Sequence, residues 1–531
     1  MFNKLCIANR GEIAVRIIKT CRRLGIRTLA VYSEADRHAL FVGMADEAAY
    51  LGPAEARASY LDGTKLVAVA RQFGADAVHP GYGFLAENAA FAELCQNAGV
   101  VFIGPHIEAI RSMGSKIEAK RIAEHAGVAT VPGYHGDKQD DATLCAAAKA
   151  LGFPVLIKPS AGGGGKGMRV VRDDAGLSEA LTLARREALA AFADDRLLLE
   201  RYVEEPRHLE VQIAGDKHGN VIHLLERECS IQRRYQKLIE EAPADFLSET
   251  IRQELSTDAL RIAGGIGYDS LGTVEFIYDH CAGRYYFLEM NTRLQVEHPV
   301  TEMITGIDLV ELQIRIAAGE PLPLTQADLT CNGWAIEARV NAENPAAGFL
   351  PETGTITLYA EPATDGVRID SGITRGSQVS PYYDSLLAKV IAHGDSRSTA
   401  LQHLLTALDR YMIGGVSTNS EFLYDLLSLP AFSNAPLSTR FIDQHFPVGW
   451  TAGAHAGEME QVAAVVVHAL AHEQQGTLIN QSPTDVHTSP WRRLGSWRVI
   501  EQAGFPGTTE ITLSNGRAHH TLRLSGRRGR Y

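Results

Sequence analysis

Residues 3–32 predict a strand, an amphipathic helix and a second strand in direct succession, and this unit sets the fold class. The three segments are "KLCIA", "GEIAVRIIKTCRRLG" and "IRTLAVYS". Two more strands are predicted in "ADAVHPGYGFLAEN" and "VVFIGP", up to residue 105. Strands that alternate with helices form doubly wound parallel sheets, whose carboxyl-end loops bind ligands. Tyr82 lies on one such loop, where a packed loop aromatic is an equal alternative.

The rest of the chain predicts a different architecture. From about residue 116, short strands follow one another closely: "RLLLERYV", "HLEVQIAG", "NVIHLLE", "SLGTVEFIYD" and "RYYFLEMN". They indicate an antiparallel α+β region. A third region, about 331–446, contains "WAIEARVNAE", "GTITLYAE" and "SLLAKVIAHG". Beyond it lie linker-like residues around one helical run, "MEQVAAVVVHALAHE", and three short strands, "GSWRVI", "TEITLS" and "HHTLRL". Three strands make a poor core of their own.

Charge and cysteine content narrow the function classes. The 531 residues carry a formal net charge of −12, which argues against a nucleic-acid binder. There is no secretory leader and no apolar run of membrane-spanning length, so we expect no membrane partner. The cysteines number seven, and none forms a C-x-x-C pair. We therefore expect reduced thiols in a cytoplasmic protein, without a cysteine-rich zinc site.

A run of glycines lies between two predicted strands, in "KPSAGGGGKGMRVV", residues 158–171. A P-loop is excluded because Met168 stands where Lys should follow the second glycine. A dinucleotide turn is excluded because Met-Arg-Val-Val predicts a strand and not a helix. Two interpretations remain: a surface turn without a ligand, or a mobile hairpin tip that offers bare N–H groups to a polyphosphate. Lys158 and Lys166 favour an anion.

Residues 287–299, "FLEMNTRLQVEHP", alternate polar and apolar side chains. The polar positions are Glu289, Asn291, Arg293, Gln295 and Glu297. A strand would place all five on one face. A solvated edge strand alternates in the same way. The present set, however, contains two carboxylates, a guanidinium and two amides. A face that only contacts solvent has no need of these groups, because Lys and Thr would serve it as well. The stretch therefore predicts a site.

The same stretch suggests a metal. Glu275 in "TVEFIYD" precedes it on a neighbouring strand, between apolar residues. Glu275 and Glu289 predict a Mg²⁺ site, because this ion takes one or two carboxylates together with nucleotide phosphates; Asn291 adds a neutral oxygen. Arg293 suits a planar oxyanion such as bicarbonate. Together with the cations Lys116, Lys158, Arg233, Arg234 and Lys237, this inventory predicts nucleotide phosphoryl transfer.

These motifs together resemble biotin carboxylase, an ATP-grasp ligase. The resemblance is carried, in order from residue 1 to about 446, by "ANRGEIAVRII", "HPGYGFLAEN", "GSK", "KPSAGGGGKGMRVV", "RHLEVQI", "RECSIQRRYQK", "EMNTRLQVEHPVTE" and "IEARVNAEN". The pattern is most similar to the biotin-carboxylating alpha subunits of acyl-CoA carboxylases of the propionyl-, methylcrotonyl- or geranyl-CoA type. The tail segment "SPWRRLGSWRV" also resembles those subunits.

The resemblance implies a domain plan. A Rossmann-like N-terminal domain would span 1–115, and an ATP-grasp domain with a mobile lid would span 116–330. The C-terminal biotin carboxylase domain would span 331–446, followed by a linker helix and a partial β region over 447–531. The glycine run then corresponds to the lid that closes over ATP.

The resemblance also implies site roles. ATP would bind to Lys116, Lys158, Gly164, Gly165, Glu200, Val203, His208 and Gln232, with residues 200–203 acting largely through backbone groups. Mg²⁺ or Mn²⁺ would bind to Glu275, Glu289 and Asn291. Bicarbonate would bind to Lys237, Arg293, Gln295 and Val296. Glu297 would be the general base, Arg339 would stabilise the biotin enolate, and Tyr82 would lie near the ureido ring.

The implied reaction begins when Glu297 deprotonates bicarbonate, which attacks the γ-phosphate to give carboxyphosphate. Carboxyphosphate yields CO₂ and phosphate, the phosphate removes the ureido proton of biotin, and the biotin nitrogen captures CO₂. The implied partners are a biotin carboxyl carrier protein or domain, a carboxyltransferase beta subunit, and a second copy of the chain or a larger complex.

Two departures from the family pattern stand out. Tyr235 occupies a position where many relatives have histidine, and no Met-Lys-Met occurs, so we expect the chain to carry no biotin of its own. Two other functions stay open: another ATP-grasp ligase that joins a carboxylate to an amine, and an inactive nucleotide-binding module. Glu297, Lys237 and Arg339 argue against both.

Overall fold

The computed structural model describes residues 1–161, 167–192, 194–434, 436–451, 507–514 and 519–526. The chain divides into two units, Met1–Thr451 and Ala452–Tyr531. In the second unit, β24 (Gly507–Ser514) and β25 (His519–Gly526) form an antiparallel hairpin, which confirms two of the predicted tail strands. The predicted strand "GSWRVI" and the helical run at 459–473 lie outside the described residues.

The N-terminal part is a five-stranded parallel sheet in the order β3-β2-β1-β4-β5, which confirms the doubly wound prediction. Its strands are β1 (Lys4–Ile7), β2 (Arg27–Ser33), β3 (Glu47–Gly52), β4 (Ala77–His79) and β5 (Val101–Phe102). The accompanying helices are α1 (Gly11–Arg23), α2 (Leu40–Met44), α3 (Gly63–Gln72), α4 (Ala89–Asn97) and α5 (Ile107–Met113). Asn9, directly after β1, donates to the carbonyl oxygens of Pro80 and Tyr82. The carboxyl-end loops of β1 and β4 are thus joined.

A four-stranded sheet in the order β6-β9-β7-β8 flanks the glycine run. It contains β6 (Gly133–Tyr134), β7 (Val155–Pro159), β8 (Arg169–Val171) and β9 (Leu197–Arg201). The helices α7 (Asp141–Leu151) and α8 (Leu177–Phe192) share an apolar core with this sheet. β7 and β8 pair in antiparallel register, so the predicted hairpin is confirmed. Gly164 and Gly165 lie outside the described residues.

The largest sheet has eight strands, in the order β14-β13-β10-β11-β12-β15-β22-β20. Its strands are β10 (Pro206–Gly215), β11 (Val221–Arg233), β12 (Gln236–Ala242), β13 (Leu271–Asp279), β14 (Arg284–Asn291), β15 (Trp334–Asn341), β20 (Val367–Ser371) and β22 (Leu386–Gly394). β12 pairs with β15. One continuous sheet therefore crosses residue 331, where the sequence predicted a new region; the domain limits themselves stay predictions.

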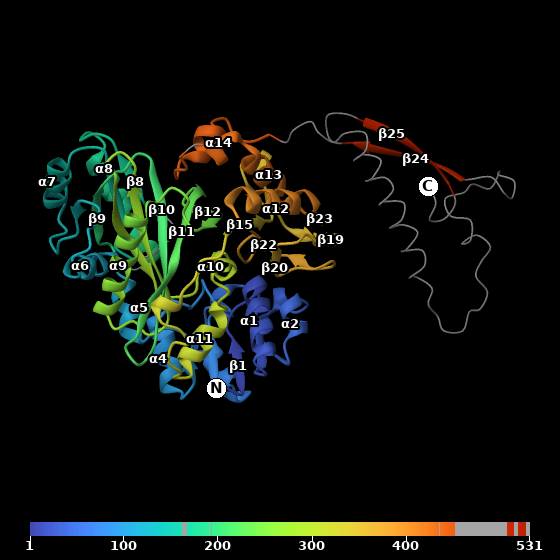
Figure 1. Ribbon diagram of the computed structural model, residues 1–531, viewed down its shortest axis with the longest axis horizontal. Helices are drawn as coiled ribbons and strands as arrows, with labels where there is room; N and C mark the ends of the chain where they lie inside the picture. The colour runs from blue at the N-terminus through green and yellow to red at the C-terminus, as the bar shows by residue number, and fades with distance from the viewer. Residues whose placement is uncertain (162–166, 193, 435, 452–506, 515–518, 527–531) are drawn as a thin grey trace. The chain divides into compact units, whose positions relative to one another are not determined.

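Helices cover this sheet and connect it to the N-terminal part (Figure 1). They are α6 (Lys116–His125), α9 (Glu249–Gly265), α10 (His298–Thr305), α11 (Leu309–Ala317), α12 (Arg397–Arg410), α13 (Ser420–Ser428), α14 (Pro430–Asn434) and α15 (Phe441–His445). α1 lies against β20 and β22. None of the described helices is both long and apolar enough for a membrane span. The cysteines are all unpaired.

The strand predicted through residue 297 is wrong at its end, because β14 stops at Asn291. Two features end it. Glu87, from the N-terminal part, accepts the backbone N–H of Thr292 at 3.0 Å, and Pro299 sits in the first turn of α10, where its fixed φ favours a helix start. Arg293, Gln295 and Glu297 therefore lie on a connecting loop and not on a strand face. The segment "GTITLYAE" also divides, into β18 (Gly354–Thr355) and β19 (Leu358–Ala360).

A glycine at the contact between β20 and α1 tests this packing. A Cβ on Gly372 would lie 2.5 Å from the backbone nitrogen of Glu12 and 2.7 Å from the carbonyl carbon of Gly11. We predict that Gly372→Ala lowers the free energy of unfolding by about 1–3 kcal/mol, because backbone atoms must move apart. Gly264→Ala in α9, with no atom within 4 Å of its Cβ, is the control and should keep or raise stability. Equal melting temperatures for the two variants would contradict the packing account.

Candidate active site

One cavity of about 640 Å³ opens between the three sheets. All the site residues implied by the resemblance that the structure describes line it: Tyr82, Lys116, Lys158, Glu200, Val203, His208, Gln232, Lys237, Glu275, Glu289, Asn291, Arg293, Gln295, Val296, Glu297 and Arg339. They come from β7, β9 to β15, the β4 loop, the start of α6 and the loop after β14. The fold thus brings residues up to 257 positions apart (82 to 339) into one cavity.

The strand register explains part of this convergence. Arg227 on β11 lies opposite Glu210 on β10, and Glu210 lies opposite Glu275 on β13. Glu275 in turn lies opposite Glu289 on β14. Because directly paired residues project to the same face of a sheet, the four side chains form one row across four strands. The sequence did not predict that these four charged residues form one row.

Lys237 lies at the centre of three carboxylates in the cavity region, those of Glu210, Glu275 and Glu297. Its ammonium group donates to Glu210, to Glu275 at 3.0 Å and to Glu297 at 2.6 Å. Burial alone would lower the pKa of Lys237, but the three carboxylates raise it well above its ordinary value. The lysine is therefore a fixed cation at neutral pH.

Glu297 is a buried carboxylate between two cations. Lys237 contacts one oxygen, and Arg339 contacts the other at 2.8 Å. Burial would raise the pKa of Glu297, yet Lys237 and Arg339 hold it well below its usual range. Arg339 is itself fixed by Glu240, which is buried on β12. An ionised acceptor is thus present in the cavity at neutral pH, as a base requires.

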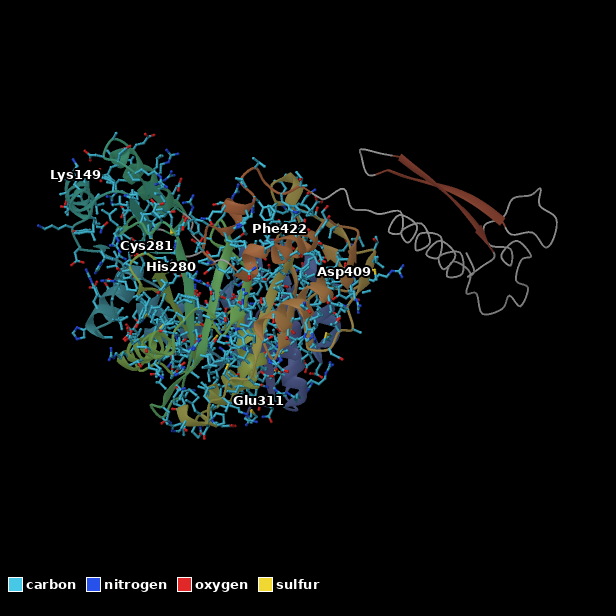
Figure 2. The ribbon with its side chains drawn as sticks, turned by 45° about the horizontal axis from the view of Figure 1, so that its top comes forward. Lys149, His280, Cys281, Glu311, Asp409 and Phe422 are labelled. Carbon is cyan, nitrogen blue, oxygen red and sulfur yellow. The ribbon has the colours of Figure 1, made fainter. Side chains whose placement is uncertain are left out.

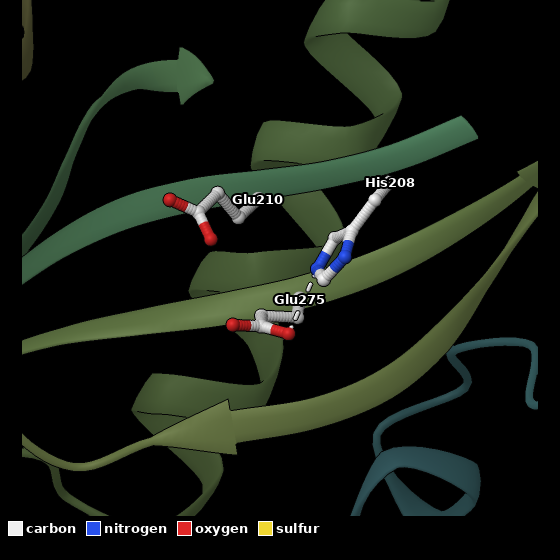
Figure 3. A group of neighbouring side chains, drawn as sticks. All are labelled: His208, Glu210 and Glu275. Carbon is white, nitrogen blue, oxygen red and sulfur yellow. Dashed lines mark hydrogen bonds and ion pairs between the residues drawn. The ribbon is translucent and has the colours of Figure 1, made fainter. Parts of the chain in front are cut away.

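Figure 3 shows a second group, His208 and Glu210 on β10 with Glu275 on β13. Gln232 donates to Nδ1 of His208 at 2.6 Å, and Nε2 of His208 donates to Glu275 at 2.8 Å. Ligand-type atoms of His208, Glu210 and Glu275 lie within 4.8 Å of one another, as in a metal site. The Lys237 ammonium, however, bonds to both carboxylates. Lys237 therefore balances part of the negative charge of these two carboxylates.

The metal set expected from the sequence lies along the same row. Glu275 and Glu289 are cross-strand neighbours, and Lys116 lies 3.3 Å from Glu289. The amide of Asn291 donates to Glu275 at 2.8 Å, and its oxygen accepts from Arg293 at 3.0 Å. Carboxylate and amide oxygens on adjacent strands fit a hard, oxygen-preferring ion such as Mg²⁺ or Mn²⁺.

Arg293 is held by the loop on which it lies and by the N-terminal part. It donates to Glu87 at 2.7 Å, to Gln295 at 3.0 Å and to Asn291. Its guanidinium plane therefore has a fixed orientation toward the cavity, as recognition of a planar oxyanion requires. Glu87 was not predicted as a site residue, although it stands in the motif "HPGYGFLAEN", five residues after Tyr82.

The residues expected to bind ATP contain an ion pair that the sequence did not predict. Glu200 was expected to act through its backbone, but its carboxylate contacts Lys158 and a further lysine, Lys120. Val203 follows β9 on the cavity wall. Tyr235 also lines the cavity and is half exposed; it sits in the two-residue β11–β12 turn, where Arg234 and Tyr235 both have positive φ. Arg233 donates to the carbonyl oxygen of Gly348 instead of lining the cavity.

Lys389 is another residue near the site that the sequence did not predict. It is fully buried, donates to the carbonyl oxygen of Val296 at 2.9 Å and lies 3.3 Å from Glu12. Its ammonium is 6.0 Å from the ring centre of Tyr82. Lys389 thus links β22 to the loop that carries Glu297. A lysine inside the apolar run "SLLAKVIAHG" is the signal that could have revealed it.

Glu12, on the cavity wall, gives a pH-dependent prediction. Burial raises its pKa to about 7, against the attraction of Lys389. Between the ordinary carboxyl pKa and about pH 7 the folded chain keeps a proton that the unfolded chain releases, so Glu12 reduces stability as pH rises through this window. We predict that Glu12→Gln is about 1–3 kcal/mol more stable than wild type at pH 8, at about 1.4 kcal/mol per pKa unit, and nearly equal at pH 4.5. The measurement is thermal unfolding at both pH values; a difference that grows toward low pH would contradict it.

Three protein-family models match successive parts of the first unit. The family described as "Biotin carboxylase, N-terminal domain" matches residues 1–110. "Carbamoyl-phosphate synthase L chain, ATP binding domain" matches 115–325, and "Biotin carboxylase C-terminal domain" matches 337–444.

Individual relatives agree with these matches. Biotin carboxylase 1 of Bacillus subtilis is 49% identical over 449 residues, which cover 85% of this chain and 100% of that protein. The mitochondrial methylcrotonoyl-CoA carboxylase subunit alpha of Arabidopsis thaliana is 52% identical over 497 residues, 93% of this chain and 67% of that protein. The chain thus spans about two thirds of the length of that relative.

A solved structure agrees as well. The biotin carboxylase domain of Hydrogenobacter thermophilus 2-oxoglutarate carboxylase, a dimer in complex with MgADP, ADP and bicarbonate, superposes with a TM-score of 0.81 at 48% identity, covering 84% of this chain and 98% of that one. With a full-length relative at 49% identity and a cavity lined by the motif residues, the chain belongs to the biotin carboxylase family.

Proposed function

We propose that this chain carboxylates biotin with bicarbonate at the expense of ATP. The observation that carries the proposal is the buried contact of Glu297 with both Lys237 and Arg339, in the same cavity as the phosphate-side lysines Lys116 and Lys158. A base, a fixed cation for the developing enolate and cations for polyphosphate are thus assembled in one place.

ATP is proposed to bind along Lys116, Lys158, the 200–203 hinge, His208 and Gln232. Glu275, Glu289 and Asn291 would hold Mg²⁺ or Mn²⁺, which when bound would neutralise phosphate charge. Lys116 contacts Glu289, and Lys158 contacts Glu200. Both lysines are therefore held in place before the nucleotide arrives, which reduces the conformational entropy lost on binding.

Bicarbonate is proposed to bind between Lys237, Arg293, Gln295 and Val296, next to Glu297. Lys237 and Arg293 supply fixed positive charge, and Lys389 holds the Val296 peptide through its carbonyl oxygen. Glu297 accepts the bicarbonate proton at its carboxylate, so that the oxygen can attack the γ-phosphate. Because Lys237 stabilises the ionised form, proton uptake by Glu297 requires that the substrate weaken this ion pair.

Biotin is proposed to bind with its ureido oxygen toward Arg339 and its ring near Tyr82. Arg339 is held by Glu240 and Glu297, so its guanidinium is oriented before charge develops on the ureido oxygen. A pre-oriented cation lowers the barrier without a reorganisation cost during the reaction.

The partners follow from the relatives. Several are named alpha subunits of methylcrotonoyl-CoA or propionyl-CoA carboxylase, and one solved relative is a dimer. We infer a biotin carboxyl carrier protein or domain, a carboxyltransferase beta subunit and a self-assembled dimer or larger complex as partners. Localisation in the cytoplasm stays a prediction, since the methylcrotonoyl-CoA and propionyl-CoA carboxylase relatives from eukaryotes are named as mitochondrial proteins.

The reaction is tested by phosphate release from MgATP. We predict that phosphate release depends on bicarbonate, because bicarbonate is the nucleophile that Glu297 deprotonates. Release should rise when free biotin is added, because Arg339 stabilises the biotin enolate that captures CO₂. The measurement is phosphate release with and without bicarbonate in CO₂-depleted buffer, with mass-spectrometric detection of carboxybiotin. Release indifferent to bicarbonate would contradict the carboxylase proposal, and an amide product would favour another ATP-grasp ligase.

The base is tested by Glu297→Gln, which keeps side-chain size and removes the proton acceptor. We expect a loss of turnover of about 10²–10⁴-fold with MgADP binding retained. Glu320→Gln, an exposed carboxylate paired with Arg315 outside the cavity, is the control and should keep wild-type turnover. Wild-type turnover in Glu297→Gln would show that Glu297 has only a structural role.

A further inference from the structure

Lys120 is a buried lysine outside the set of residues that line the cavity. It lies on α6, one turn after Lys116, and its side chain is 2% exposed. Its ammonium contacts Oε1 of Glu200 at 2.6 Å and the carbonyl oxygen of Val131 at 3.2 Å. A lysine is almost never buried without a paired charge, so the contact with Glu200 offsets the cost of burying Lys120.

Glu200 bridges two lysines. One carboxylate oxygen contacts Lys120 and the other contacts Lys158, whose side chain is 6% exposed. Burial would raise the pKa of Glu200, but Lys158 and Lys120 together lower it to about 2. The carboxylate is therefore ionised across the physiological range, and the group consists of two ammonium ions and one carboxylate.

The net charge of this group decides how it acts on an anion. A Lys158–Glu200 pair alone is neutral and attracts a polyphosphate weakly. Lys120 adds a second positive charge. It does not line the cavity, and it shares the Glu200 carboxylate with Lys158. Lys158, which does line the cavity, then keeps its attraction for a phosphate oxygen.

The location of α6 supports the same role. The backbone N–H of Lys116 donates to the carbonyl oxygen of Ser160 at 2.9 Å, so the helix start is attached to the end of β7. Lys116 and Lys120 lie on one face of α6, because residues four apart are neighbours on a helix. The pairing of Lys120 with Glu200 holds the other end of this turn against β9.

We propose that Lys120 is a positioning residue for nucleotide binding, which shares the Glu200 carboxylate with Lys158 and so leaves Lys158 available to the phosphates. This inference rests on the proposed ATP site. Lys120 touches no reacting group, so its removal should weaken nucleotide affinity and leave turnover at saturating MgATP within about threefold of wild type.

The test measures MgADP affinity by titration calorimetry, without turnover. Lys120→Met should bind MgADP roughly tenfold more weakly, because the lost charge lies behind Glu200 and acts on the phosphates from well beyond contact distance. Lys120→Arg should bind as wild type does. Lys149→Met is the control: Lys149 on α7 forms an exposed pair with Asp174 at the outer surface (Figure 2), and affinity should not change.

A double variant separates charge from packing. Lys120→Met with Glu200→Gln restores a net charge of one positive, on Lys158 alone, and should recover affinity to within about threefold of wild type. If Lys120 acts only by packing, the double variant stays as weak as Lys120→Met or weaker, and the proposal fails. Wild-type affinity in Lys120→Met also overturns it.

If Lys120→Met does not fold, Lys120→Gln takes its place, since glutamine keeps a donor to Glu200 without the charge. It too should bind about tenfold more weakly, and wild-type affinity would overturn the proposal. Failure of the proposed function appears in the wild-type chain, as absent MgADP binding or absent bicarbonate-dependent turnover. Failure of the inference appears only in the variants.

Discussion

The site depends on one interaction, the ammonium group of Lys237 inside a cage of three buried carboxylates. Glu210, Glu275 and Glu297 come from three different segments of the chain, and all three accept a hydrogen bond from the same nitrogen. Without the cation they would repel one another in a medium that screens poorly. Removing one partner of such a network leaves an uncompensated buried charge, which costs several kcal/mol. The charge arrangement that serves chemistry is thus also the arrangement that holds the segments together.

The eight-stranded sheet makes this cage possible because it joins two regions that look separate in the sequence. β12 carries Lys237, and its neighbour β15 carries Arg339. The same sheet continues to β22, where Lys389 reaches back to the Val296 carbonyl. A polar cluster of this size is stable only because nearly every member has a partner, as for Arg227, whose guanidinium contacts Glu210, Gln212, Thr273 and Thr301.

Most element types and sixteen of the residues that line the cavity could be predicted from the sequence, because motifs and strand patterns are local. The interactions that connect them could not. Glu87 meets Arg293 across 206 positions, and its contact with the neighbouring Thr292 N–H is part of what ends β14 at Asn291 instead of at residue 297. Lys389 and Glu12 meet across an even longer stretch, and Lys120 on α6 meets Glu200 on β9. The register that aligns Arg227, Glu210 and Glu275 is set by pairing of distant strands, which periodicity alone does not specify.

The central claim is that bicarbonate, activated by Glu297 beside Lys237, is the nucleophile that attacks ATP. The most direct test is turnover of MgATP with ¹⁸O-labelled bicarbonate in unlabelled water, followed by mass spectrometry of the released phosphate. The account predicts that each phosphate released gains one oxygen from bicarbonate, because the new P–O bond is made by a bicarbonate oxygen and is kept when CO₂ departs. Phosphate that carries only oxygen from ATP and water would show that water is the nucleophile and would contradict the account.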